Sequence, residues 1–136
     1  MGAHVTLFHA LPGASRPEVE RELTAQRDRA PFPVRVGEPF SLGRGVAYRL
    51  VSAELDALHR QLQERWRALL TPQDSQRFRA HVTVQNKVTP EHARDTLARL
   101  RAAYRPDDAA GLGLELWRYD GGPWTSLARH EFEGTG

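Results

Sequence analysis

The tetrapeptide His4-Val5-Thr6-Leu7 near the start of the chain returns as His81-Val82-Thr83-Val84 in its second half. Successive side chains of an extended strand point to opposite faces, so the histidine and threonine of each copy would share one face and the two aliphatic residues the other. Each copy is therefore predicted to be a half-buried strand, with its apolar face on a core. Two such strands facing each other would bring two imidazoles and two hydroxyls together.

Similar elements follow each copy. Ser15-Arg16-Pro17-Glu18 matches a helix start with a capping box, and Thr89-Pro90-Glu91 predicts a second helix start with proline just inside it. Each predicted helix is followed by a hairpin pattern. The expected strands are residues 32–36 and 40–42 returning at 46–51, and residues 112–119 and 124–132 joined by a turn at 120–123.

A third helix is predicted between the two copies. Its apolar residues are spaced by three and four positions: Leu55, Leu58, Leu62, Trp66 and Leu69. Ser52 is the expected N-cap, and Thr71-Pro72 the expected stop. A stripe of this kind predicts packing in a core, including Trp66, rather than a ligand site. A similar stripe after the second copy contains Ala93, Leu97, Leu100 and Tyr104.

These patterns predict an α+β fold with a bilobal, pseudo-twofold duplication of strand-helix-hairpin units. Two antiparallel sheets would flank a central cleft. We expect a single domain over residues 1–136, with lobe one at about 1–51, a linking helix at about 53–70 and lobe two at about 79–133. The His4 and His81 rings should then face a common cavity with room for a phosphate between them.

Composition narrows the possible functions. The sequence of 136 residues has no cysteine, which excludes disulfides, cysteine-based zinc sites and thiol catalysis. It has no apolar run long enough for a membrane span, so we expect a soluble, cytoplasmic protein without a membrane partner. The net charge of +2 is too small by itself to indicate nucleic-acid binding.

Positive charge is nevertheless expected near the second copy. Lys87 lies at an even offset from His81, so a strand that ran this far would place it on the same face, together with Gln85. Arg77 and Arg79 come just before the strand. A cationic rim beside histidines suits a phosphate. Arg79 and Lys87 are therefore candidate substrate-binding residues.

Two aromatic residues are further candidates for substrate binding. Trp117 and Tyr119 alternate with Leu114, Leu116 and Arg118 in the last hairpin, so they would offer a nucleobase a stacking surface on one face. Packing within the hairpin is an equally good interpretation, because aromatic residues commonly fill such sheets.

The two motifs resemble those of the 2H phosphoesterase superfamily, in particular its 2′-5′ RNA ligase-like branch. The motifs here read His4-Val5-Thr6-Leu7 and Arg79-Ala80-His81-Val82-Thr83-Val84, and residues 116–124 resemble the terminal hairpin of that branch. One departure is that family members usually carry a strand and a helix before the first motif, whereas His4 lies almost at the N-terminus.

The resemblance implies a metal-independent phosphodiesterase that needs no cofactor and no obligate protein partner. Its substrates would be 2′,3′-cyclic phosphates or 2′-5′ phosphodiesters of RNA ends or small nucleotides. His4 and His81 would act as general acid and general base near neutral pH. By analogy with the family, His4 protonates the leaving oxygen and His81 activates water. Thr6 and Thr83 would donate hydrogen bonds to the phosphate oxygens.

Two other classes of function stay open. One is a binding module of the same fold, which recognises RNA or nucleotide phosphates without turnover. The other is a histidine-ligated metal protein, which is disfavoured because neither motif has a histidine or carboxylate neighbour on the same strand face. The remaining histidines are predicted to be structural or solvent-exposed, and a regular first strand would turn His9 away from the site. They are His9, His59, His92 and His130.

Overall fold

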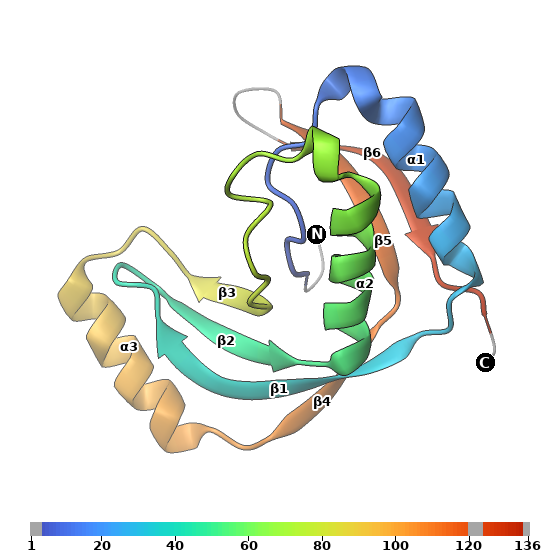
Figure 1. Ribbon diagram of the computed structural model, residues 1–136. Helices are drawn as coiled ribbons and strands as arrows, with labels where there is room; N and C mark the ends of the chain where they lie inside the picture. Colours follow the sequence, from blue (N-terminus) through green and yellow to red (C-terminus); the bar gives the residue numbers. More distant parts are fainter. Residues whose placement is uncertain (1–3, 120–123, 135–136) are drawn as a thin grey trace.

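The computed structural model describes residues 4–119 and 124–134, which form a mixed α+β fold around a curled antiparallel sheet (Figure 1). The helices are α1 (Arg16–Ala25), α2 (Ala53–Arg65) and α3 (Pro90–Ala103), with short 3₁₀ turns at Gly13–Ser15, Gln26–Asp28 and Arg67–Leu69. The strands are β1 (Phe32–Ser41), β2 (Val46–Val51), β3 (His81–Gln85), β4 (Asp107–Gly111), β5 (Gly113–Tyr119) and β6 (Trp124–Glu131). The predicted α+β class is confirmed.

The helix starts follow the predicted caps in two of three cases. The hydroxyl of Ser52 accepts a hydrogen bond from the backbone of Leu55 at 3.1 Å, and that of Thr89 accepts one from His92 at 3.1 Å. The capping box at Ser15 is wrong, because its side chain makes no capping hydrogen bond. Its backbone N–H closes the preceding 3₁₀ turn instead, and the residue does not adopt the extended conformation of an N-cap.

The main sheet combines strands from both halves of the sequence. Its order is β3-β2-β1-β4, with every neighbouring pair antiparallel. The two segments predicted at 32–36 and 40–42 form one continuous strand, β1, with a bulge between Val36 and Pro39. The strand that carries His81 therefore pairs with the hairpin of the first half. The proposed lobe boundaries themselves stay a prediction.

Strand β4 was not predicted from the sequence. Its residues, Asp-Asp-Ala-Ala-Gly, include none of the β-branched or aromatic types that favour strands. It forms because it pairs with the first half of β1, from Phe32 opposite Gly111 to Val36 opposite Asp107. A side chain at Gly111 would place its Cβ 2.5 Å from a ring carbon of Phe32, so the close pairing at this end of the strand requires glycine.

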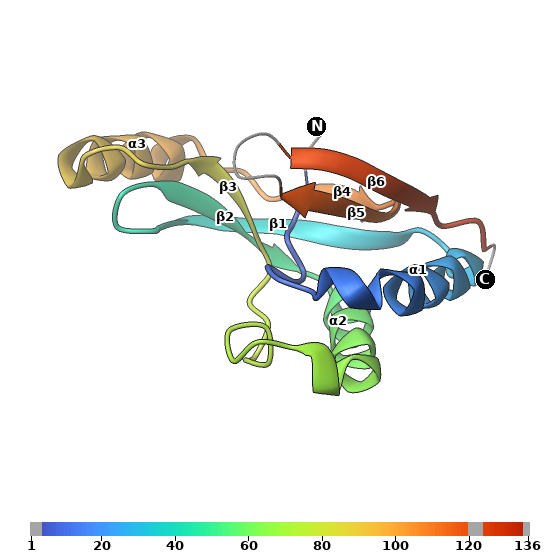
Figure 2. The ribbon, with the colours of Figure 1, turned by 90° about the horizontal axis from the view of Figure 1, so that it is seen from above.

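The second predicted hairpin is confirmed as a separate two-stranded sheet. Strands β5 and β6 pair from Gly113 opposite Glu131 to Tyr119 opposite Trp124. The turn predicted at residues 120–123 lies outside the described residues. Helix α3 lies at one end of the long strand β1 and α1 at the other, in both Figure 1 and the view from above in Figure 2.

The core lies between α1, α2, the start of β1 and the β5–β6 hairpin. Its buried residues are Val19, Leu23, Phe32, Val34, Leu55, Leu58, Leu62, Trp66, Ala80, Leu114 and Phe132. The leucine stripe of α2 is therefore core, as predicted. In the part of the chain that is described, no helix is long and apolar enough to cross a membrane.

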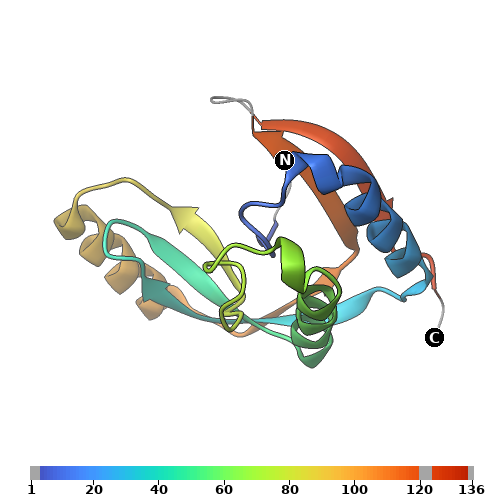
Figure 3. The same cartoon turned by 45° about the horizontal axis from the view of Figure 1, so that its top comes forward.

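The N-terminal copy of the motif does not form the predicted strand. Residues 4–10 lack regular secondary structure, and side chains bind three of their backbone groups. The Nε2 of His59 donates to the carbonyl of Leu7 at 3.0 Å. The carboxylate of Asp74 accepts the backbone N–H groups of His9 at 2.8 Å and Ala10 at 2.9 Å. Figure 3 shows this segment between the loop after α2 and the β5–β6 hairpin.

An aromatic stack ties this segment to the second motif. The imidazole of His59 lies parallel to the ring of Phe8 at a centroid distance of 4.7 Å, and parallel to that of Phe78 at 4.0 Å. Phe8 directly follows the first motif, and Phe78 comes three residues before His81. We call Phe8, His59 and Phe78 the aromatic stack. It fixes both motif segments to one side chain of α2.

His59 and Asp74, the two side chains that anchor the N-terminal segment, have shifted pKa values. Burial lowers the pKa of His59, and the weaker opposing effects of the Leu7 hydrogen bond and nearby carboxylates do not reverse this. For Asp74, burial would raise the pKa, but hydrogen bonds from His9 and Ala10 outweigh it, so the pKa lies below its ordinary value. At neutral pH the stack therefore contains a neutral imidazole, and the carboxylate beside it is charged.

Acid should lower the folding stability through protonation of His59. An unfolded chain protonates His59 at a pKa of about 6.5, whereas the folded chain does so only at lower pH. The unfolded state therefore binds more protons below about pH 6.5, and folding stability should fall as the pH drops from there. Denaturant unfolding between pH 8 and pH 5 measures this loss.

His59→Phe is the matched variant for this test. It should keep the rings stacked and lose this part of the pH dependence. Its overall stability should be lower, by up to about 1–3 kcal/mol, because the partly buried Leu7 carbonyl loses its donor. The control His92→Phe, on the exposed face of α3, should keep the dependence of the wild type. An unchanged pH dependence in His59→Phe would show that this imidazole does not titrate between folded and unfolded states.

Candidate active site

The second copy of the motif forms strand β3, as predicted. His81 lies opposite Arg49 of β2, and Thr83 lies opposite Ala47. The His81 and Thr83 side chains share one face by alternation, while Ala80 on the other side is buried in the core. Thr83 is exposed and His81 is half-buried, so this face offers an imidazole and a hydroxyl to solvent.

A single hydrogen bond fixes the tautomer of His81. Its Nδ1 lies 3.0 Å from the backbone carbonyl oxygen of Arg79. A carbonyl can only accept a hydrogen bond, so Nδ1 carries the proton. In the neutral ring, Nε2 is then the basic atom, and it can take a proton from a nucleophile or return one.

Phe40 and Arg49 surround His81 and were missed from the sequence. The Phe40 ring meets the His81 ring edge-on at a centroid distance of 6.0 Å, and the guanidinium carbon of Arg49 lies 5.0 Å from the centre of the Phe40 ring. Both residues come from the first hairpin, far from His81 in sequence. Their position beside His81 depends on the pairing register of β2 with β1 and β3. The alternation of residues within one strand does not predict that register.

The first copy of the motif keeps its predicted alternation without being a strand. Val5 and Leu7 pack against the core, whereas His4 and Thr6 are exposed. The anchors at Leu7, His9 and Ala10 hold the segment against the core.

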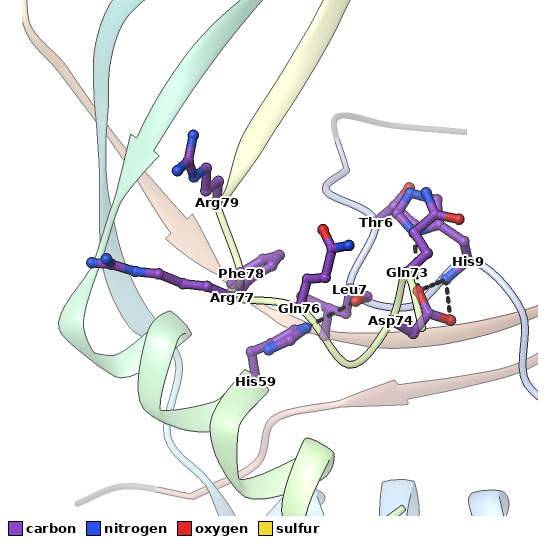
Figure 4. Close-up of a pocket in the computed structure, with 10 residues that line it drawn as sticks. All are labelled: Thr6, Leu7, His9, His59, Gln73, Asp74, Gln76, Arg77, Phe78 and Arg79. Atoms are coloured by element: carbon purple, nitrogen blue, oxygen red, sulfur yellow. Dashed lines mark hydrogen bonds and ion pairs between the residues drawn. The ribbon is translucent and has the colours of Figure 1, made fainter. Parts of the chain in front are cut away.

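A pocket of about 180 Å³ lies where the two motif segments approach each other. Figure 4 shows its lining residues, which are Thr6, Leu7, His9, His59, Gln73, Asp74, Gln76, Arg77, Phe78 and Arg79. Thr6 belongs to the first motif, and Arg79 stands two residues before His81. Of the four predicted catalytic residues only Thr6 lines this pocket, whereas His4, His81 and Thr83 are not among its lining residues. A common cavity for the His4 and His81 rings stays a prediction.

His9 differs from its predicted position. It was expected to face away from the site if the first strand stayed regular, but the chain bends at Leu7 and at His9 itself. His9 consequently lines the same pocket as Thr6 (Figure 4). Its Nδ1 lies 3.1 Å from a carboxylate oxygen of Asp74, which is itself buried. His9 thus helps to anchor the N-terminal segment.

The predicted alternation beyond Thr83 fails because β3 contains a bulge. Thr83 lies opposite Ala47, but Gln85 lies opposite the next residue, Val46, so one residue is extra. The amide of Gln85 donates to the hydroxyl of Thr96 on α3, and its predicted place beside His81 is wrong. Lys87 lies past the end of β3 with a left-handed backbone (φ 57°), so alternation no longer predicts its face. Its contact with substrate stays a prediction.

The aromatic candidates lie in the separate hairpin. Leu116 packs against the core, and its neighbour Trp117 is half-buried. Tyr119 is 60% exposed and lies against Trp124, which is 53% exposed, at a ring-centroid distance of 4.8 Å. This pair is an exposed aromatic surface. Stacking of a nucleobase on Trp117 or Tyr119 stays a prediction.

In residues 4–119 and 124–134, no group of three or more histidine, aspartate or glutamate side chains is placed to hold a metal ion.

Comparison with known families identifies the chain. No curated protein is similar enough in sequence to match it. The model of the 2′-5′ RNA ligase superfamily matches residues 1–123, a span that contains both histidine motifs. The chain therefore belongs to the 2′-5′ RNA ligase superfamily, in agreement with its resemblance to the 2H phosphoesterases.

Proposed function

We propose that this protein is a metal-independent phosphodiesterase of the cytoplasm. It opens 2′,3′-cyclic phosphates or cuts 2′-5′ phosphodiesters of RNA ends or small nucleotides. The observation that carries the proposal is the aromatic stack, because it anchors both motif segments to His59 beside one pocket. Membership of the superfamily supports the reaction class.

The proposed reaction uses the two histidines in turn. The Nε2 of His81 takes a proton from water, whose oxygen attacks the phosphorus. The bond from phosphorus to one ribose oxygen breaks, and His4 donates a proton to that oxygen. The products are a phosphomonoester and a free ribose hydroxyl. Each well-placed proton transfer contributes typically about 10²–10⁴ to the rate.

The remaining groups would hold the phosphate and the rest of the substrate. Thr6 and Thr83 donate hydrogen bonds to its non-bridging oxygens, where negative charge develops. Arg79 has a double role, since its carbonyl orients the His81 ring while its guanidinium adds positive charge. Lys87 would contact phosphate, and Trp117 and Tyr119 would contact a base.

Removing either histidine should abolish most turnover. In hydrolysis of uridine 2′,3′-cyclic phosphate, His4→Ala and His81→Ala should each lower kcat at least about a hundredfold, the lower bound for a lost acid or base. The double variant should be little worse than the worse single one, since both groups act on one step. His92→Ala is the matched control and should keep full activity.

Two results would contradict this assignment. Full activity in His4→Ala would show that the first motif has no part in the chemistry. Binding of cyclic nucleotides and oligonucleotides by the wild type without any turnover would instead favour the binding module.

Chelation should leave the activity intact. All proton transfers and all charge stabilisation are assigned to side chains, so turnover of a 2′,3′-cyclic nucleotide should survive excess EDTA. The measurement is the initial rate before and after dialysis against chelator. Loss of activity that a divalent ion restores would establish a metal-dependent reaction.

A further inference from the structure

Two arginines continue the face of β3 that carries His81. The backbone of Leu50 donates to the carbonyl of Ala80 at 3.0 Å, so the pairing with β2 extends one residue before β3 begins. Phe78 and Ala80 point into the protein, while Arg77 and Arg79 are exposed. Figure 4 shows both arginine side chains extending away from Thr6 and His9. Alternation places them on the side of the sheet that carries His81.

Two further arginines come from the neighbouring strands. Arg49 of β2 is the direct partner of His81, and side chains of directly opposed residues point the same way. Two residues along β2, Val51 shares this face and is 54% exposed. The partner of Val51 on β1 is Arg35. We call Arg35, Arg49, Arg77 and Arg79 the arginine face.

The arginine face carries an excess of positive charge among the described residues. None of its four members forms an ion pair with a carboxylate there, and all four are exposed. One acidic residue, Asp108, lies opposite Arg35 on β4. The nearby Asp74 is buried and already accepts hydrogen bonds from His9 and Ala10.

The other side of the same sheet is covered. The hydroxyl of Tyr104, just after α3, donates to the carbonyl of Val36, and Thr96 on α3 accepts from Gln85. Val46 on this side is completely buried. On the side that carries His81, Ala47 is also buried, but Thr83, Val51 and the four arginines are exposed.

The neighbourhood of His81 suits a flexible strand with several phosphates. Arginine guanidinium groups bind phosphate oxygens through paired hydrogen bonds. Grooves that bind single-stranded nucleic acid combine such cations with aromatic rings, and here the Arg49 guanidinium lies over the Phe40 ring. The pocket of about 180 Å³ is smaller than the roughly 300 Å³ at which small-molecule pockets begin, so it does not enclose a whole nucleotide.

We propose that the arginine face holds the sugar–phosphate backbone of a single RNA strand whose end reacts at His81. The protein then acts on RNA ends of two or more nucleotides in preference to mononucleotides, and Arg35 and Arg49 set this preference. The inference rests on the proposed phosphodiesterase function and narrows its substrate to oligonucleotides.

Substrate length tests the inference. The substrates are uridine 2′,3′-cyclic phosphate and the uridine di- and tetranucleotides that end in the same group. We expect kcat/KM to rise at least about tenfold from the mononucleotide to the tetranucleotide, the scale of one charge-assisted hydrogen bond. Arg35→Gln and Arg49→Gln should each lower the value for the tetranucleotide by a larger factor than that for the mononucleotide. Arg94→Gln on α3 is the control and should change neither.

Equal kcat/KM values at all lengths would overturn the inference. So would an equal loss for both substrates in the two variants, because the arginines would then serve only the reacting phosphate.

Binding separates this inference from the proposed function. If the wild type turns over no substrate, the phosphodiesterase proposal fails, but a labelled uridine tetranucleotide with a terminal 2′-phosphate still reports on the arginine face. Its affinity should fall with salt, and each of the two substitutions should reduce the slope of log K against log salt by about 0.7. The RNA assignment would be overturned if the variants had the same salt slope as the wild type. It would also be overturned if the wild type bound a glutamate peptide of the same charge as tightly as the tetranucleotide.

Discussion

The stacking of His59 between Phe8 and Phe78 is the contact on which the candidate site depends. Helix α2 is part of the core, and His59 projects from it with 3% of its surface exposed. One ring face holds the segment after the first motif, and the other holds the segment before the second. Because the rings are parallel and the imidazole also donates to the Leu7 carbonyl, the N-terminal segment has a defined position without belonging to a sheet.

The sheet arranges an arginine and the imidazole of the proposed proton transfer side by side at the second motif. The pairing of β3 with β2 sets Arg49 beside His81, while the Arg79 carbonyl selects the tautomer of the His81 ring. The His81 ring and the backbone of Arg49 are thus positioned by hydrogen bonds of the main chain, and the Arg49 guanidinium lies over the Phe40 ring. A ring held in this way need not reorganise during the proposed proton transfer.

The sequence predicted the elements well where local patterns determine them. The α2 stripe, the caps at Ser52 and Thr89 and the β5–β6 hairpin are set by spacing and by polar side chains next in the chain. It failed where distant residues decide the conformation. The first motif looks like a strand, yet His59 and Asp74 hold it as an irregular segment, and β4 is a strand only because β1 pairs with it. The repeat is enough to predict four candidate residues, which are His4, Thr6, His81 and Thr83. The places of Phe40 and Arg49 could not be predicted, because they depend on strand register and bulges.

The central claim is that the two motif segments form a single acid–base site. The most direct test is an NMR titration of the imidazole signals of His4 and His81 with uridine 2′-phosphate, a product of the proposed reaction. A shared site predicts that both rings shift along the same binding curve, with one dissociation constant, while the His92 ring does not respond. A shift of His81 alone, with His4 unaffected at saturation, would contradict a common site for the two motifs.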